Sequence, residues 1–489
     1  MATNVTYLLK NVFVSHTNNQ MKLADIHFTD KIKTIIPKSD QLIDWKDIAD
    51  HNEWMRFRQA FQSDDRTTGG KIYDGHYLLA VPGSIDAHVH FNTPGFENRE
   101  DFDHASLAAA YGGVTTVFDM PCTSIPPVTS VDNLNSKYQA IKDRSWIDYG
   151  FWGGISGTDL QDEKNTLQKI EALADAGVVG FKVYCISGMA SFTDLTYNQI
   201  EKVAHWVKIT GLPLAVHAED KHAVLSRQHQ LQKRGENDWR AFCQSRDAFA
   251  ESEAVSQLIT IAKKTDCHIH IVHLSSKEAL DMIRKAKSSG VNITVETCPH
   301  YLHFTQHDFD DPQIRAFLKT SPPVKSEQDR NALWHGLRDG TIDYITTDHA
   351  GCDPLEEKNA NNFWDVYAGI PGVEHRVPFF ISEGFMKNRL TLSETINLMT
   401  RNVANNFKIN AIKGDLEPGK DADIVLVNLW NRQIVKSEDM HSKGKYTPFE
   451  GFEFACSVDT TFLRGRLIMD KDTQYKDKTK CGQFLQLKK

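Results

Sequence analysis

The chain has 489 residues, of which 40% are hydrophobic and 25% are charged, and its formal net charge is −8. These proportions are typical of soluble globular proteins, and no apolar run reaches the roughly eighteen residues that a membrane span requires. An acidic net charge gives no electrostatic reason to expect nucleic acid as a partner. The eight cysteines include no CxxC pair and the first residues show no secretory signal, so we expect reduced thiols and a cytoplasmic location.

The first eighty residues contain three short β-like stretches, at residues 5–14, 21–28 and 31–36, separated by turns that carry Asn or Asp. A polar segment with several aromatic residues, 38–75, interrupts this pattern, and we interpret it as an inserted helix or loop without an assigned role. Residues 1–77 are therefore predicted to be the N-terminal part of a small β domain.

From residue 78 to 410 the pattern changes to apolar strands that are followed by amphipathic helices. In ESEAVSQLITIAKKT, for example, Ala254, Val255, Leu258 and Ile259 lie on one helical face. About eight such units are recognisable, which predicts an α/β fold, a (β/α)8 TIM barrel with its chemistry at the C-terminal ends of the strands. Residues 411–489 become β-like again, so both chain ends are expected to form one small β-sandwich domain, with a tail.

The sharpest local motif is DAHVH at the end of an apolar stretch, where His88 and His90 are two residues apart. Strand residues at this spacing point to the same face and can bind one metal ion, although such pairs also occur as surface or hydrogen-bonded core histidines. Two more histidines close strands, His217 in LAVHAED and His273 in HIHIVHLSS. Strand alternation places the two earlier histidines of the latter stretch on the opposite face and favours His273.

A carboxylate and a lysine complete the set of candidates. Asp348 follows the apolar strand of IDYITTDHA, where it could bind a metal and shuttle a proton, or cap a helix. Lys182 lies inside the apolar strand GVVGFKVY, where an unpaired ammonium is costly. It could snorkel or pair with an acid, or its lowered pKa could free the amine to take up CO2 as a carbamate.

Taken in order, the stretches VPGSIDAHVHFNTPG, AAAYGGVTTVFDMP, GVVGFKVY, LAVHAED, IHIVHLSS, VETCPHYL, TTDHA and LEPGKDADIVLV resemble the cyclic amidohydrolases. This family of TIM-barrel hydrolases includes allantoinases, dihydroorotases and dihydropyrimidinases or hydantoinases. The resemblance implies two divalent metal ions, with zinc as the default among several metals. The implied ligands are His88, His90 and Asp348 on one ion, His217 and His273 on the other, and carboxylated Lys182 between them. Asp348 would also act as the catalytic base and then acid.

The loops around the predicted site differ between the branches of the family. HFNTPG and FDMPCTSIPPVTSV are similar to allantoinases, which implies hydrolysis of allantoin to allantoate. Dihydroorotases resemble the chain at TTDHA and EEK, but they carry an arginine and an asparagine for the substrate carboxylate where this chain has Asn92 and Cys122. Arg99 is a conceivable substitute. AGIPGVEHR is closer to hydantoinases. We favour the allantoinase branch, with the other two as alternatives.

The expected substrate is a small cyclic ureide or amide, which presents alternating N–H and C=O groups. The expected substrate contacts are Asn92, Ser187, Gly188, His300, Ser321 and Gly369. Each also has a structural interpretation, since serines cap helices and histidines pair in cores. The resemblance further implies a homodimer or homotetramer. A non-catalytic scaffold is disfavoured, because every expected ligand position is retained.

Overall fold

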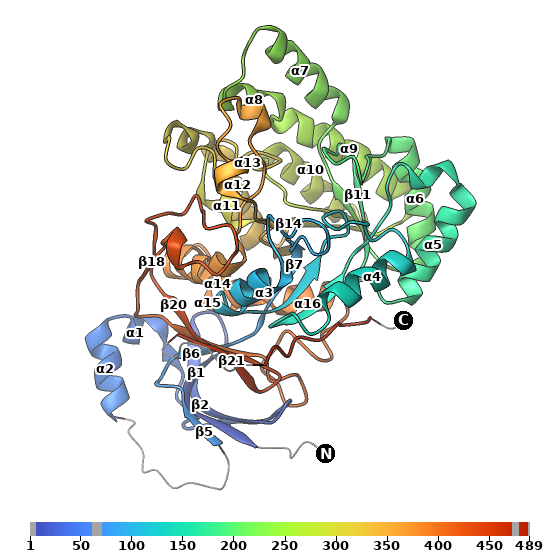
Figure 1. The fold of residues 1–489 in the computed structure, drawn as a ribbon. Helices are drawn as coiled ribbons and strands as arrows, with labels where there is room; N and C mark the ends of the chain where they lie inside the picture. Colours follow the sequence, from blue (N-terminus) through green and yellow to red (C-terminus); the bar gives the residue numbers. More distant parts are fainter. Residues whose placement is uncertain (1–5, 61–70, 472–478, 488–489) are drawn as a thin grey trace.

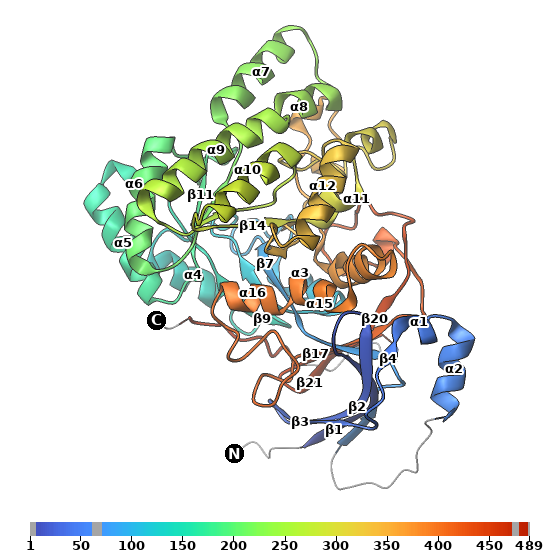
Figure 2. The ribbon, with the colours of Figure 1, turned by 180° about the vertical axis from the view of Figure 1, so that it is seen from behind.

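The computed structural model describes residues 6–60, 71–471 and 479–487. It consists of a barrel wrapped by helices and a smaller sheet domain built from both chain ends (Figure 1). The view from behind shows the N-terminal strands β1–β3 lying with β17 and β21 on the side of the barrel away from α7 and α8 (Figure 2). The eight cysteines, all within the described residues, form no disulfide.

The smaller domain is a nine-stranded sheet in the order β21-β20-β17-β6-β1-β2-β3, with β4 added to β2 and β5 to β1. Its strands are β1 (Tyr7–Ser15), β2 (Gln20–Phe28), β3 (Ile32–Pro37), β4 (Ile43–Asp44), β5 (Lys71–Asp74), β6 (Leu79–Pro82), β17 (Ile424–Asn428), β20 (Ser457–Leu463) and β21 (Arg466–Asp470). The separate sheet domain made from both chain ends is therefore confirmed. Because β6 belongs to this sheet, the chain passes into the barrel at Gly83, a few residues after the expected boundary.

The segment predicted to interrupt the sheet, 38–75, contains β4, α1 (Trp45–Ile48), α2 (His51–Ala60) and β5, while its residues 61–70 lie outside the described part. Trp54 of α2 stacks on Trp430 with the ring centroids 4.5 Å apart. The indole N–H of Trp430 donates to the carbonyl of Ile48. The segment therefore packs on the sheet domain through aromatic rings, on the side away from the barrel's helices α7 and α8 (Figure 1).

The barrel closes through eight strand positions in the described chain. Its segments are β7 (Ser84–His90), β8 (Val114–Asp119), β9 (Asp148–Phe151), β10 (Gly153–Gly154), β11 (Phe181–Tyr184), β12 (Leu214–His217), β13 (Ile269–Ile271), β14 (Ile293–Thr297), β15 (Tyr344–Ile345) and β16 (His349–Ala350). All pair in parallel. β9 and β10 are two parts of the third strand, and β15 and β16 are two parts of the eighth, which pairs with β14 and then with β7. The TIM barrel is therefore confirmed.

Helices cover the outside of the barrel, and none in the described part is long and apolar enough to cross a membrane. They are α3 (Phe102–Tyr111), α4 (Val131–Ile141), α5 (Glu163–Asp175), α6 (Tyr197–Thr210), α7 (Lys221–Lys233), α8 (Trp239–Ser245), α9 (Ala248–Thr265), α10 (Lys277–Ser288), α11 (Pro299–His303), α12 (Glu327–Arg338), α13 (Pro354–Glu357), α14 (Arg376–Phe379), α15 (Leu392–Met399) and α16 (Arg401–Asn406). The apolar face read from the sequence of α9 is buried, with Ala254, Val255 and Leu258 inaccessible to solvent.

The end of the chain, predicted as a tail after the small β domain, contacts both bodies. Phe484 stacks on the rings of Phe151 and Tyr149 of the barrel, and Nη2 of Arg464, between β20 and β21, donates to the carbonyl of Cys481. The amide of Leu485 donates to the carbonyl of Tyr149. Removing part of the aromatic ring of Phe484 from water stabilises this arrangement. This contact explains why the end of the tail is held on the protein. Residues 472–478 of the tail lie outside the described residues.

A buried charge network joins the two bodies. The ammonium of Lys413 lies 2.9 Å from Asp148 of β9, 3.0 Å from Asp421 and 2.6 Å from Asp423, at the start of β17. Arg464 also contacts Asp148. Although burial opposes it, the attraction of the three carboxylates raises the pKa of Lys413. This acidic cluster is therefore neutralised by the protein's own cations, so its geometry does not indicate a metal site.

We expect Lys413→Met to lower the free energy of unfolding by about 3–5 kcal/mol, because it leaves buried carboxylates without their partner. Lys31→Met is the matched control, since Lys31 contacts Asp421 from a partly exposed position, and it should cost less than about 1 kcal/mol. Urea-induced unfolding followed by circular dichroism measures both. Equal losses in the two variants would contradict this account of the network.

Candidate metal centre

Polar side chains gather where the barrel strands end, which is where TIM-barrel enzymes carry their chemistry. His88 and His90 close β7, and His217 is the last residue of β12. Lys182 lies inside β11, and Asp348 immediately precedes β16. The parallel pairing brings these strand ends to one rim of the barrel, although the residues are far apart in the sequence.

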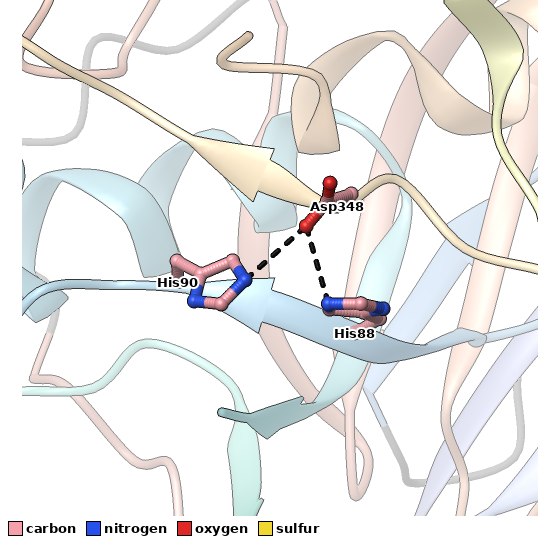
Figure 3. Close-up of side chains that lie close together, drawn as sticks. All are labelled: His88, His90 and Asp348. Carbon is pink, nitrogen blue, oxygen red and sulfur yellow. Dashed lines mark ion pairs between the residues drawn. The ribbon is translucent and has the colours of Figure 1, made fainter. Parts of the chain in front are cut away.

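Three of the expected ligands converge on one point: His88, His90 and Asp348 (Figure 3). Nε2 of His88 lies 3.1 Å and Nε2 of His90 lies 3.2 Å from the same carboxylate oxygen, Oδ1 of Asp348. One ligand atom from each residue lies within 4.8 Å of the others. Two imidazole nitrogens and a carboxylate oxygen at such spacing can hold a divalent cation.

His217 and His273 form a second pair beside this group. Nδ1 of His217 lies 3.0 Å from Nε2 of His273, so the two nitrogens face the same space. The ring centroid of His273 is 5.6 Å from that of His88 and 4.7 Å from that of His217. His273 therefore lies between the two groups, as adjacent metal positions require.

His273 reaches this position by a route that strand alternation did not predict. Strand β13 ends at Ile271, and His273 has a left-handed φ of 40°. His270 also points into the barrel, because its Nε2 lies 3.1 Å from Glu296, the residue that contacts His88. The predicted separation of His273 from His270 by opposite strand faces was thus wrong. It is the turn of the backbone after the strand that brings His273 to the centre.

Lys182 is fully buried, and its Nζ has no hydrogen-bond partner among the described residues. Its Nζ lies over the ring of Tyr184, 5.0 Å from the centroid. Burial lowers the pKa of Lys182 to about 8. Burial also lowers the pKa of His217 and His273, and the positive charge of Lys182 adds to this effect. The imidazoles are therefore held in the neutral form that binds metals.

Two buried glutamates orient the histidines, and neither was expected from the sequence. Oε1 of Glu296 lies 2.5 Å from Nδ1 of His88, which leaves Nε2 directed at the centre. Oε2 of Glu219 lies 2.8 Å from Nε2 of His217, which leaves Nδ1 directed there. Although burial acts in the opposite direction, Arg246 and His217 lower the pKa of Glu219 to about 2. A carboxylate behind a ligating imidazole fixes its tautomer and orientation.

A third acid, Asp86 of the DAHVH motif, ties the first barrel strand to the last. Its Oδ2 accepts a hydrogen bond from the hydroxyl of Thr347 at 2.5 Å, and its Oδ1 accepts from the amide of Thr347. Thr347 immediately precedes Asp348, which has a left-handed φ of 50°. Asp86 therefore fixes the backbone that presents Asp348.

Two of the expected substrate contacts are buried near the centre. Asn92 follows β7 and donates from Nδ2 to the carbonyl of Gly351 at 3.4 Å. His300 has an Nε2 without a hydrogen-bond partner among the described residues. Burial lowers the pKa of His300 to about 4, and the carboxylate of Asp348 acts on it in the opposite direction. The lowered pKa of His300 favours a neutral imidazole, and the charge of Asp348 acts on it.

The other expected contacts lie in the surrounding loops and stay predictions. The hydroxyl of Ser187 donates to the carbonyl of Phe192 at 2.6 Å, and Gly188 borders open space. Ser321 is half-buried. The N–H of Gly369 donates to the carbonyl of Lys319, so its backbone donor is used within the protein.

Comparison with known proteins adds to this geometry. The model of the family described as "Amidohydrolase family" matches residues 79–468. An allantoinase of Enterococcus faecalis is 33% identical over 416 residues, which cover 83% of this chain and 89% of that protein. An allantoinase of Saccharomyces cerevisiae is 32% identical and covers 83% of this chain and 85% of its own length. The structure of an L-hydantoinase (dihydropyrimidinase) from Arthrobacter aurescens has a TM-score of 0.86 and 27% identity, covering 98% of this chain and 99% of that one.

We expect Glu296→Gln to weaken metal retention about ten- to a hundred-fold, because His88 loses the carboxylate that orients it. The matched control is Glu383→Gln, since Glu383 is also buried but binds Arg389 on the outside of the barrel. Metal content after dialysis against a series of chelator concentrations measures the effect. A folded Glu296→Gln protein that keeps its metal as well as the control would show that Glu296 has no such role.

Proposed function

The chain belongs to the amidohydrolase family and is a cyclic amidohydrolase, and on this premise we propose that its substrate is allantoin, which it hydrolyses to allantoate. The observation that carries the proposal is the convergence of His88, His90 and Asp348 beside His217 and His273 at the mouth of the barrel. The two allantoinases described above each match 83% of this chain. This likeness supports allantoin over other cyclic amides.

We propose that this centre holds two divalent cations, with zinc as the default. The residues fit such ions, because within the described chain three buried nitrogens of this group have no hydrogen-bond partner: Nζ of Lys182, Nε2 of His88 and Nδ1 of His273. The proposed ligands are His88, His90 and Asp348 for one ion and His217 and His273 for the other, with Lys182 between them. Bound there, the cations would polarise the ring carbonyl and lower the pKa of a water molecule.

Lys182 fits this role only as a carbamate. Burial lowers the pKa of its ammonium to about 8, so the free amine is accessible near neutral pH. The ammonium first loses a proton, and addition of the free amine to CO2 then forms an N–C bond and releases a second proton to solvent. The two steps together replace a buried positive charge with a negative one. A carbamate offers two oxygens, which suits a ligand shared by two cations.

Asp348 carries the proton in the proposed reaction. Its Oδ1 faces His88 and His90, and the carboxylate can take a proton from the attacking water. The water oxygen bonds to the ring carbonyl carbon, the C–N bond breaks, and Asp348 returns the proton to the leaving nitrogen. His300, whose Nε2 has no hydrogen-bond partner among the described residues, is the proposed hydrogen-bonding partner for a polar group of the ring.

The alternatives are the hydrolysis of a hydantoin or dihydropyrimidine and that of dihydroorotate. The first is favoured by the fold-wide likeness to the L-hydantoinase. The second needs a cation for the substrate carboxylate. Arg99, the candidate substitute, is engaged by Glu357, with Nη2 2.6 Å and Nε 2.8 Å from Oε1. This ion pair argues against dihydroorotate. A cytoplasmic location and a homodimer or homotetramer stay predictions.

The purified, metal-loaded protein should open allantoin in preference to hydantoin, dihydrouracil and dihydroorotate when ring opening is followed for each. Asp348→Asn should lower kcat by about 10²–10⁴-fold, because it removes the proton carrier. Asp353→Asn is the matched control, since Asp353 accepts from the amide of Leu355 at the start of α13, and it should keep its activity.

The outcomes separate the candidates. Preferred turnover of hydantoin or dihydrouracil would move the assignment to that branch, and turnover of dihydroorotate alone would show that another cation replaces the missing arginine. Inertness toward all four compounds in a metal-loaded protein would contradict the proposal.

A further inference from the structure

Two buried lysines without an acidic partner lie beside the proposed active site. Lys319 is 3% exposed and Lys358 is 5% exposed. Among the described residues, no carboxylate lies within ion-pair distance of either ammonium, in contrast to Lys413. Burial lowers the pKa of Lys319 to about 7 and that of Lys358 to about 8. Burying a cation is costly, and an apolar side chain of similar size would serve stability better.

Both ammonium groups are bound by backbone carbonyls of one loop, residues 363–370. Nζ of Lys319 donates to the carbonyls of Phe363 at 2.6 Å, Trp364 at 3.2 Å and Val366 at 2.6 Å. Nζ of Lys358 donates to Tyr367 at 2.8 Å and Gly369 at 2.9 Å. Five carbonyls of one short loop thus point at two cations that approach from different segments of the chain.

The far end of this loop is attached to the strand that carries Asp348. The amide of Ala350 donates to the carbonyl of Ile370 at 3.0 Å, and His349 forms a bridge with Ile370. Gly369 fits tightly, because a Cβ there would lie 2.6 Å from the carbonyl oxygen of Ala350. The hydroxyl of Tyr446 gives the carbonyl of Gly369 a second donor at 2.9 Å. A shift of the loop would therefore move the wall next to Asp348.

The loop also contacts Arg99, the candidate partner for the carboxylate of dihydroorotate. The guanidinium of Arg99 lies over the ring of Tyr367, 4.7 Å from its centroid. Glu357, the neighbour of Lys358, holds Arg99 in its ion pair and accepts from the amide of Tyr367 through its carbonyl. One clamped loop thus connects the Asp348 strand with the Arg99 side of the site.

We propose that Lys319 and Lys358 are positioning residues that clamp the loop 363–370 as the specificity wall of the active site. This inference rests on the proposed function only in that the loop borders the substrate. Their amino groups donate to carbonyls of the loop and do not bind substrate. The clamp fixes the cavity for a cyclic amide, and its loss loosens the wall without removing a metal ligand.

The test compares Lys319→Met and Lys358→Met with Lys358→Arg, which keeps the charge. It also includes Tyr446→Phe, which removes the hydroxyl that contacts the carbonyls of Gly369 and Ala350 and the thiol of Cys352 but disturbs no buried charge. Lys413→Met is the control for a buried lysine lost elsewhere. Amide hydrogen exchange of peptides covering residues 363–370 is the first readout, because it needs no substrate. The KM and kcat for whichever cyclic amide the wild-type protein opens are the second.

The two lysine-to-methionine variants should exchange faster in this loop and raise KM about ten- to a hundred-fold, since hydrogen bonds to charged groups are lost. Metal content should stay unchanged and kcat should fall less. Tyr446→Phe should give a smaller change in the same direction, and Lys358→Arg should recover most of the exchange protection. Lys413→Met should change neither loop exchange nor KM.

Wild-type exchange and KM in folded Lys358→Met and Tyr446→Phe would overturn the proposal, as would a loss of metal with KM unchanged. Failure to open allantoin would count against the proposed substrate alone.

Discussion

The candidate site depends on the burial of one amine among imidazoles. Lys182 has no hydrogen-bond acceptor within the described chain and no exposure to solvent, a state that is costly for an ammonium ion. Its charge also helps to keep His88, His217 and His273 neutral. Conversion of Lys182 to a carbamate would remove the unpaired buried cation and put an anion beside the neutral imidazoles. The same surroundings are thus unfavourable for a lysine alone and would favour the proposed bridging ligand between two cations.

The rest of the barrel holds this pocket in shape. Glu296 and Glu219 sit behind His88 and His217 and direct their free nitrogens inward. Asp86 ties the first strand to the residue before Asp348. Charged side chains that stabilise the fold have different partners from those at the centre. Lys413 is surrounded by carboxylates, and Lys319 and Lys358 donate to backbone carbonyls. Among the described residues, Lys182 has neither kind of partner, which is the observation behind its proposed conversion to a carbamate.

The sequence predicted the features that depend on local pattern. The HxH spacing and the apolar runs before His217 and Asp348 were sufficient to place these residues at strand ends, and the apolar run around Lys182 placed it inside a strand. Alternating strands and helices predicted the barrel. The roles of Glu296 and Glu219 were missed for different reasons. Glu296 is 208 positions from its partner His88, so no spacing links them. Glu219 lies two residues after the predicted ligand His217 in HAED, and only its burial shows its role.

Strand alternation failed at His273 because the left-handed backbone after β13 has no signature in a run of apolar residues. The packing of the tail was not predicted, because it depends on one aromatic residue, Phe484, that no periodic pattern marks.

The most direct measurement is the state of Lys182 in the metal-loaded protein. Metal analysis should give two divalent ions per chain, and ¹³C NMR after exposure to ¹³C-labelled bicarbonate should show a carbamate signal that is absent from Lys182→Met. That variant should also lose bound metal, because the ligand between the two ions is removed. A wild-type protein that binds two ions and opens its substrate without a carbamate signal would contradict the central claim, as would a Lys182→Met variant that retains both ions.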